Sequence, residues 1–292
     1  MAKKRNIFND LHHAWGGYER DLHNKLWNKH GSVLSPLQST VRHIAAGSLA
    51  ILLFMSHPVT TSIIAQGLQS DILPVQEVVH TQAELISTLS QHVPPEVLPL
   101  SADQELQLEK KLSEFFRLPI KATLEGKRLN RTYGYIGAEQ HLMRFAGDTI
   151  LNHFGNPDDL NIYGASGMAP GRGAWGYFTD SFEQMTQKDV ERERYYIAVQ
   201  TFLAPGWEEN TRQLYEFFKY RKMIVINPDN GKAMVVVIGD AGPSPWTGKH
   251  LGGSPEVMKY LERVDGAAKG PVLYFFIDDP EDKVPLGPIQ VH

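Results

Sequence analysis

The clearest hydrophobic pattern lies in the C-terminal third of the chain. Residues 223–226 and 233–238 are apolar runs rich in β-branched side chains, which favour strands. Residues 227–231 between them read NPDNG, with the Asn-Gly pair typical of a turn that needs positive φ. The pattern therefore predicts a β-hairpin whose second strand is followed directly by Asp240.

The chain after this hairpin carries strong turn and helix signals. Gly242-Pro243 turns the chain away from the sheet, and Thr247-Gly248 predicts a second turn. Ser254-Pro255-Glu256 combines a polar cap with a proline at the first helical position, which is typical of a helix start. We therefore expect a loop of about ten residues and then a short helix.

Upstream, short apolar runs alternate with glycines and turns from residue 119 onward. Strands are predicted at 120–124, 133–136 and 197–203. Residues 208–220 form the larger helical insertion, with an apolar face of Leu214, Phe217 and Phe218. Residues 119–292 are thus predicted to be a mainly β domain with inserted helices.

Residues 66–118 have a different, helical pattern. Two helices are predicted, at 76–92 and at 101–116, and prolines break the chain between them. Ser101 opens the second helix with a polar cap. With so few apolar positions, this segment is predicted to be a short helical stalk or docking element without a core of its own.

Residues 44–65 contain the one candidate membrane segment. The continuous apolar part, residues 44–55, is shorter than the about 20 residues that a span needs, and reaching Ala65 includes His57 and Pro58. The polar leader, residues 1–43, carries seven basic and three acidic side chains, which places the leader in the cytoplasm and the rest outside. A signal anchor, a cleaved signal and a buried helix remain open.

The amino-acid composition excludes several classes of function. The chain has 292 residues, 42% of them hydrophobic, which is ample for a core. The net charge of −4 argues against a nucleic-acid partner. Because there is no cysteine, disulfides, thiol catalysis and cysteine-based zinc sites are excluded. No cofactor and no metal site are predicted.

Asp240 is the strongest candidate for chemistry. A carboxyl at the rim of an apolar sheet loses hydration, which raises its pKa and suits a general acid acting on a glycosidic oxygen. The alternative is a structural aspartate that caps the Gly242-Pro243 turn through backbone amides. Both roles are compatible with the sequence.

Three further residues are candidate catalytic groups. Glu139 and His141 are two positions apart after a predicted strand, so strand alternation would point both to one face. His250 lies in the loop after Asp240. A surface hydrogen-bonded pair and a solvated loop histidine are the respective alternatives.

Candidate substrate-binding residues lie in or near glycine-rich loops. The aromatic side chains of Tyr163, Trp175 and Trp246 could stack on sugar rings, and Lys249 could bind acidic groups of a cell-wall polymer. Packing beneath the loops is the alternative for the aromatic residues.

The residues after 160 resemble the double-psi β-barrel of the rare lipoprotein A, expansin and barwin group. The resemblance rests on a Val-x-Val strand, an Asp-x-Gly-Pro turn, a Gly-Lys turn and a serine that starts a helix ending in leucine. Here these positions are Val235, Val237, Asp240, Gly242, Pro243, Gly248, Lys249, Ser254 and Leu261. Tyr163-Gly164 matches the Tyr-Gly opening of that family.

The resemblance implies a six-stranded barrel at 119–292 that binds cell-wall glycan outside the cytoplasm, with Asp240 as acid and base and Ser254 among the substrate-binding residues. The catalytic histidine of the family falls on Val199, so His141 or His250 would have to replace it. A lytic transglycosylase or glycosidase, an expansin-like binding module and an envelope scaffold are the alternatives. The implied partners are peptidoglycan and, through residues 44–65, a membrane.

Overall fold

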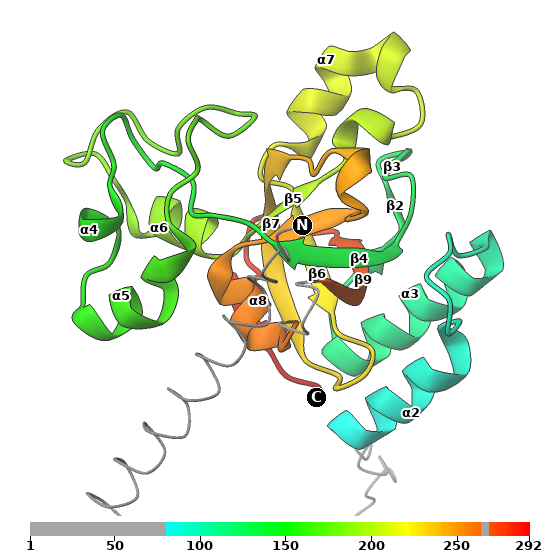
Figure 1. The fold of residues 1–292 in the computed structure, drawn as a ribbon. Helices are drawn as coiled ribbons and strands as arrows, with labels where there is room; N and C mark the ends of the chain where they lie inside the picture. Colours follow the sequence, from blue (N-terminus) through cyan, green and yellow to red (C-terminus); the bar gives the residue numbers. More distant parts are fainter. Residues whose placement is uncertain (1–79, 264–268) are drawn as a thin grey trace, which may run out of the picture. The chain divides into compact units, whose positions relative to one another are not determined.

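The centre of the protein is a β-sheet that closes into a six-stranded barrel (Figure 1). The computed structural model describes residues 80–263 and 269–292. The ring closes because one strand, β6, pairs with β7 on one side and with β9 on the other. Its members are β4 (Tyr133–Ala138), β5 (Tyr196–Val199), β6 (Lys222–Ile226), β7 (Ala233–Ala241), β8 (Leu251–Gly253) and β9 (Lys269–Ile277).

The barrel is mixed in strand direction. β4 pairs with β8 in parallel, and β5 pairs with β7 in parallel. The pairs β5–β8, β4–β9, β6–β7 and β6–β9 are antiparallel. The prediction of a β-barrel with inserted helices is therefore confirmed at this level.

Shorter strands extend the sheet at its margins. β1 (Ile120–Lys121) pairs with β9, and β10 (Gly287–Ile289) pairs with β7. A separate hairpin joins β2 (Thr123–Leu124) to β3 (Lys127–Arg128). The strand predicted at 120–124 is thus divided between two sheets.

Both faces of the barrel wall are covered, which explains why its strands are almost wholly apolar. Along β7, Met234, Val236 and Ile238 point into the interior cluster. Ala233 and Val235 belong to a second cluster on the outer face, and Val237 to a third. Alternation along one strand therefore supplies two packed faces, whose side chains belong to three clusters.

The second cluster joins the barrel to α2 (Gln82–His92) and α3 (Ala102–Phe116). Thr81 and Ser101 cap these helices, each with a reciprocal bond from the residue at the third helical position. Leu85, Leu89, Leu108 and Leu112 from these helices pack with Ile224 and Phe275 of the barrel. The described part of the predicted stalk, residues 80–118, shares the core of the barrel, because its apolar side chains pack on the outer wall of β6 and β9.

The helices after β5 complete the barrel interior. α7 (Trp207–Phe218) and α8 (Pro255–Leu261) add side chains to the interior cluster, among them Phe218 and Leu261. Ser254 caps α8, as predicted. Short 3₁₀ turns, η2 (Thr201–Leu203) and η3 (Pro245–Thr247), follow β5 and β7.

Residues 139–195, which connect β4 to β5, form an irregular lobe on the outside of the barrel (Figure 1). We call this segment the excursion. It contains α4 (Ile150–His153), α5 (Pro157–Tyr163), η1 (Gly164–Ser166) and α6 (Gln187–Arg194). Its apolar contacts with the barrel come from two places: Leu142 clusters with Tyr196, Ala198 and Val237, and Trp175 packs into the interior cluster. Buried polar side chains hold the rest of the excursion together.

The predicted leader, residues 1–43, and membrane segment, residues 44–65, lie outside the described residues, as do residues 66–79. Within residues 80–263 and 269–292, we find no helix with the length and apolar character that a membrane crossing requires.

We expect Leu112→Ala to lower the free energy of unfolding of the whole domain by about 2–5 kcal/mol, because Leu112 is fully buried between α3 and the barrel. Urea unfolding followed by tryptophan fluorescence measures this. The control is Leu106→Ala on the same helix, where the leucine is exposed and the change should stay within about 0.5 kcal/mol. Equal, small effects of both substitutions would contradict a shared core.

Candidate functional site

Asp240 lies near the end of β7, on the outer side of the barrel wall. It is opposite Ala198 of β5, and Ala198 is opposite Gly252 of β8. Gly252 is in turn opposite Gly137 of β4. Asp240 thus stands at one end of a row across four strands whose other members have small side chains or none.

Backbone amides fix one oxygen of Asp240. Its Oδ1 accepts hydrogen bonds from the N–H of Ala174 at 2.6 Å and from that of Ala241 at 2.8 Å. Among the described residues, no donor reaches the other oxygen, Oδ2. Burial raises the pKa of Asp240, and the negative charge of Glu139 adds to the rise, although the two amide bonds oppose it. Asp240 therefore anchors the loop of the excursion that contains Ala174, and its Oδ2 remains available.

Glu139 covers the glycine at the other side of this row. A methyl group placed on Gly252 would lie 2.1 Å from Oε1 of Glu139, so the absence of a side chain there makes room for the carboxylate. Lys249 donates to Glu139 Oε1 at 2.8 Å and to the carbonyl oxygen of Ala138 at 3.1 Å. The structure brings the candidates Asp240, Glu139 and Lys249 to one outer face.

The two candidate histidines do not join that group. His141 is fully buried and lies with Glu193 of α6. The strand ends at Ala138, so strand alternation does not extend to His141 and the predicted common face with Glu139 is not formed. His250 accepts a hydrogen bond at Nδ1 from the N–H of Tyr135. Burial, with the charges of Arg131 and Lys269, lowers the pKa of His250 to about 4.

The three aromatic candidates differ in how much of each side chain is exposed. Trp246, in η3, is 86% exposed, as expected for a loop residue available for stacking. Trp175 is 8% exposed, packs into the barrel interior cluster and donates its indole N–H to the carbonyl of Tyr215, so its ring faces are covered. Tyr163 is half-buried and stacks on Phe154.

One buried polar residue positions the loop around Trp246. Gln200, after β5, donates to the carbonyl oxygens of Pro243 and Lys249, which fixes both ends of the loop. The candidate Ser254 is fully buried, and its hydroxyl donates to the backbone carbonyl oxygen of Arg194 and accepts from the N–H of Val257, which caps α8. Its contacts are those of a structural residue.

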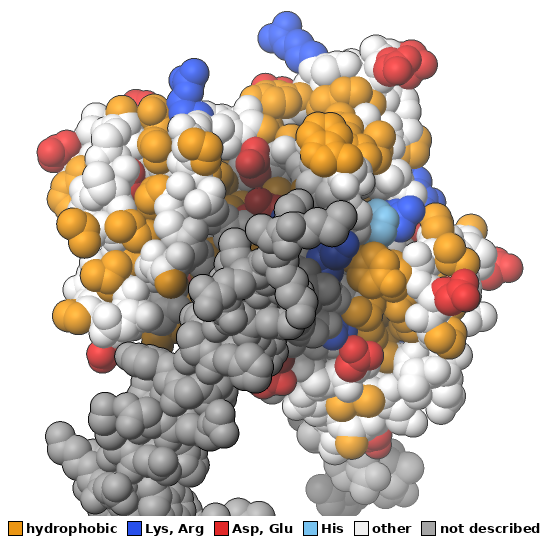
Figure 2. All heavy atoms as spheres, in the orientation of Figure 1, with side chains coloured by type: hydrophobic (Ala, Val, Ile, Leu, Met, Phe, Trp, Pro, Cys, Tyr) orange, Lys and Arg blue, Asp and Glu red, His pale blue; other side chains and the backbone are white. Residues whose placement is uncertain are grey.

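Acidic and basic side chains are interspersed over the face drawn in Figure 2.

A second group of charged side chains lies inside the excursion. Glu193 is 1% exposed, and its carboxylate accepts from the N–H of Leu142 at 2.9 Å. Nε2 of His153 lies 2.6 Å from Glu193 Oε2, and Nδ1 of His141 lies 3.4 Å from Oε1. Of all described residues, His141, His153 and Glu193 alone gather three ligand-type atoms within 4.8 Å of one another. We call these three residues the buried cluster.

Asp148 and Arg144 support the buried cluster. Oδ2 of Asp148 is 3.3 Å from Nδ1 of His153 and 2.8 Å from Nε of Arg144. Burial acts to lower the pKa of His153, but the two carboxylates outweigh it and raise the pKa to about 9. Burial would raise the pKa of Glu193, but the two histidines lower it to about 2. In this state His153 is an imidazolium between two carboxylates.

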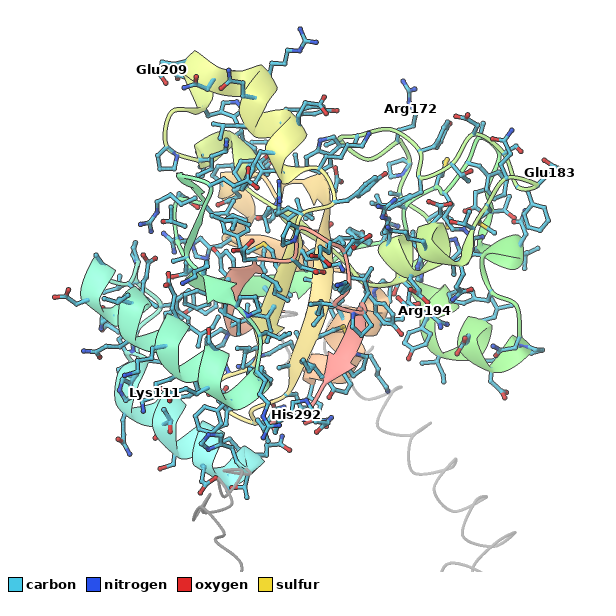
Figure 3. The ribbon with its side chains drawn as sticks, turned by 180° about the vertical axis from the view of Figure 1, so that it is seen from behind. Lys111, Arg172, Glu183, Arg194, Glu209 and His292 are labelled. Carbon is cyan, nitrogen blue, oxygen red and sulfur yellow. The ribbon has the colours of Figure 1, made fainter. Side chains whose placement is uncertain are left out.

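A cavity of about 200 Å³ opens beside the buried cluster. His153, Glu193, Arg194 and Glu256 line it. Arg194 forms an ion pair with Asp159 of α5 at 2.6 Å, and Figure 3 shows it in this part of the excursion. Glu256, in α8, is 6% exposed, and its Oε2 has no hydrogen-bond partner. Burial and the charge of Glu193 raise the pKa of Glu256 to about 7.

Of the buried cluster, only His141 was among the residues predicted from the sequence, and Glu256 was not predicted. The sequence of α6, QKDVERER, contained one signal. Its single apolar residue is Val190, so this helix has to bury charged side chains when it packs on the barrel. The partners of those side chains come from α4 and from the chain after β4, which no local pattern identifies.

Comparison with protein-family models and with curated proteins gave no match for this chain.

Proposed function

We propose that this protein binds cell-wall glycan outside the cytoplasm on the outer face that carries Asp240, and that Asp240 acts as general acid and base in cleavage of a glycosidic bond. The observation that carries the proposal is the Asp240 carboxyl itself. One oxygen is held by two backbone amides and the other is left available beside a row of residues with small side chains or none.

The chemistry requires a proton donor at the leaving oxygen and a second polar group nearby. A carboxyl whose pKa is raised stays protonated at a higher pH, which suits the donor role. Glu139, ion-paired with Lys249, is the second carboxylate on this face, and in this proposal it takes the role that the family resemblance left to His141 or His250.

The resemblance to the rare lipoprotein A and expansin group further supports the proposed glycan function. The parallel pairs β4–β8 and β5–β7, joined by the antiparallel pair β5–β8, are compatible with a double-psi barrel. In this proposal Asp240 and Lys249 keep the places that the family motif gives them. Val199, at the family's histidine position, lies in the barrel interior and offers no catalytic group.

The second candidate function is glycan binding without catalysis, as in an expansin-like module. Val199 favours it, because the family histidine is missing, and so does the exposed ring of Trp246. The two functions predict different effects of substitutions at Asp240 and Trp246.

Replacing Asp240 by asparagine should reduce release of soluble muropeptides from peptidoglycan by about 10²- to 10⁴-fold. The amide oxygen of asparagine can still accept from Ala174 and Ala241, so the fold should persist, but the side chain can no longer donate a proton as an acid. The measurement is chromatography and mass spectrometry of the soluble fraction, with Asp180→Asn, an exposed aspartate of the excursion, as control.

The pH profile of the wild type gives an independent check. Only the protonated carboxyl donates, so the rate should fall as the pH rises through the raised pKa of Asp240. Release by Asp240→Asn at the wild-type rate would place catalysis elsewhere. A wild type that releases nothing would favour the binding module.

Trp246→Ala should weaken co-sedimentation with insoluble cell wall roughly five- to tenfold, which is the loss expected for about 1 kcal/mol of stacking. Thermal stability should stay close to that of the wild type, because the ring is almost fully exposed. Phe182→Ala removes another exposed ring, from the excursion, and serves as control. Equal sedimentation of all three proteins would exclude Trp246 from the binding face.

A further inference from the structure

The buried cluster contains one polar atom that the surrounding protein leaves unsatisfied. Nδ1 of His141 has no hydrogen-bond partner, although the side chain is 0% exposed. The His153–Glu193 ion pair satisfies its own members but leaves this nitrogen 3.4 Å from the carboxylate. Because buried polar atoms without a partner are rare, the site requires a further explanation.

The outward nitrogen of each histidine faces an acceptor. Nδ1 of His153 faces Asp148 Oδ2 at 3.3 Å, and Nε2 of His141 faces the carbonyl oxygen of Tyr163 at 3.4 Å. Histidines that bind metals commonly donate their second N–H to a carboxylate or a backbone carbonyl, which fixes the ring. Both rings therefore direct their remaining nitrogens to the carboxylate of Glu193.

We propose that Nδ1 of His141, Nε2 of His153 and the carboxylate of Glu193 bind one divalent transition-metal ion of the zinc class. Two imidazole nitrogens and one carboxylate are a donor set that zinc uses when one coordination position stays open. Nitrogen ligands also favour such ions over magnesium and calcium.

The spacing of the three ligands suits such an ion. With metal–ligand distances of about 2.1 Å, tetrahedral geometry separates ligand atoms by roughly 3.4 Å. The separation of His141 Nδ1 from Glu193 Oε1 already has this value, and that of His153 Nε2 from Glu193 Oε2, 2.6 Å, has to lengthen by under ~1 Å as the metal replaces the shared proton. One ligand atom from each of the three residues lies within 4.8 Å of the other two, so small movements bring them to one ion.

The cavity beside the buried cluster supplies an entry path and a fourth ligand. His153, Glu193 and Glu256 all line it, and Oε2 of Glu256 is a second buried atom without a partner. A water molecule in the cavity takes the fourth coordination position, and the Glu256 carboxylate lines the same cavity. The proposal does not depend on the glycan function, since Asp240 belongs to a different cluster of contacts.

The test is titration of chelator-treated full-length protein with Zn²⁺ alone, followed by equilibrium dialysis and calorimetry. We expect a high-affinity site with one zinc ion per chain and a rise in the melting temperature. Glu193→Gln keeps an acceptor for Leu142 but loses the charged ligand, so binding at this site should weaken at least about 100-fold. Asp148→Asn should weaken it about 10- to 100-fold through His153.

His92→Ala removes a histidine of α2 that bonds to Thr88 and serves as matched control with unchanged zinc affinity. X-ray absorption at the zinc edge of the wild type provides a measurement that needs no folded variant, and it should show two imidazole ligands with oxygen donors. Absence of a one-equivalent site, a different number of imidazoles, or wild-type affinity in folded Glu193→Gln would each overturn the proposal.

Discussion

The buried carboxylate of Glu193 is the constraint on which the arrangement of the excursion depends. A carboxylate that is removed from water without partners costs several kcal/mol, so the chain around it has to provide donors. Those donors come from the excursion: they are the amide of Leu142 and His153 at the end of α4, while His141, just after β4, lies 3.4 Å from the carboxylate. The same requirement draws Asp148 and Arg144 into the interior. Buried charges thereby hold the excursion together, alongside the apolar contacts that Leu142 and Trp175 make with the barrel.

Closure of the barrel fixes the geometry of the other candidate site, which contains Asp240. Because β6 pairs with both β7 and β9, the strand carrying Asp240 is fixed in register with β5 and, through it, with β8. Glycine at position 252 then creates the space that the Glu139 carboxylate fills. The outer face with Asp240 and the interior of the excursion are linked through Ala174, whose amide binds Asp240. Glycan chemistry and metal binding are thus proposed for neighbouring but separate groups of residues.

Local patterns were sufficient to predict the hairpin of β6 and β7, the capped helix α3 and the start of α8, because these elements depend on residues close in sequence. The contacts of His141 could not be predicted in this way. The strand ends two residues after Ile136, and beyond that point its alternation no longer fixes a direction. His153 and Glu193 are 40 residues apart, and a pairing of that kind appears only once the fold is known. Trp175 had a loop-like sequence but is buried, because Asp240 and Tyr215 pin its loop to the barrel.

Native-state hydrogen exchange of wild type and Glu193→Gln, both treated with chelator, tests most directly whether this carboxylate holds the excursion. We expect faster exchange in the variant for amides bonded within the excursion, such as those of Leu142, Ala169 and Phe178. Amides of β6 and β9 should keep their protection. Glu191→Gln, on the same helix and bonded only to Gln187 among the described side chains, should resemble the wild type. Unchanged exchange in the excursion, or an equal loss of protection across the barrel, would contradict the account.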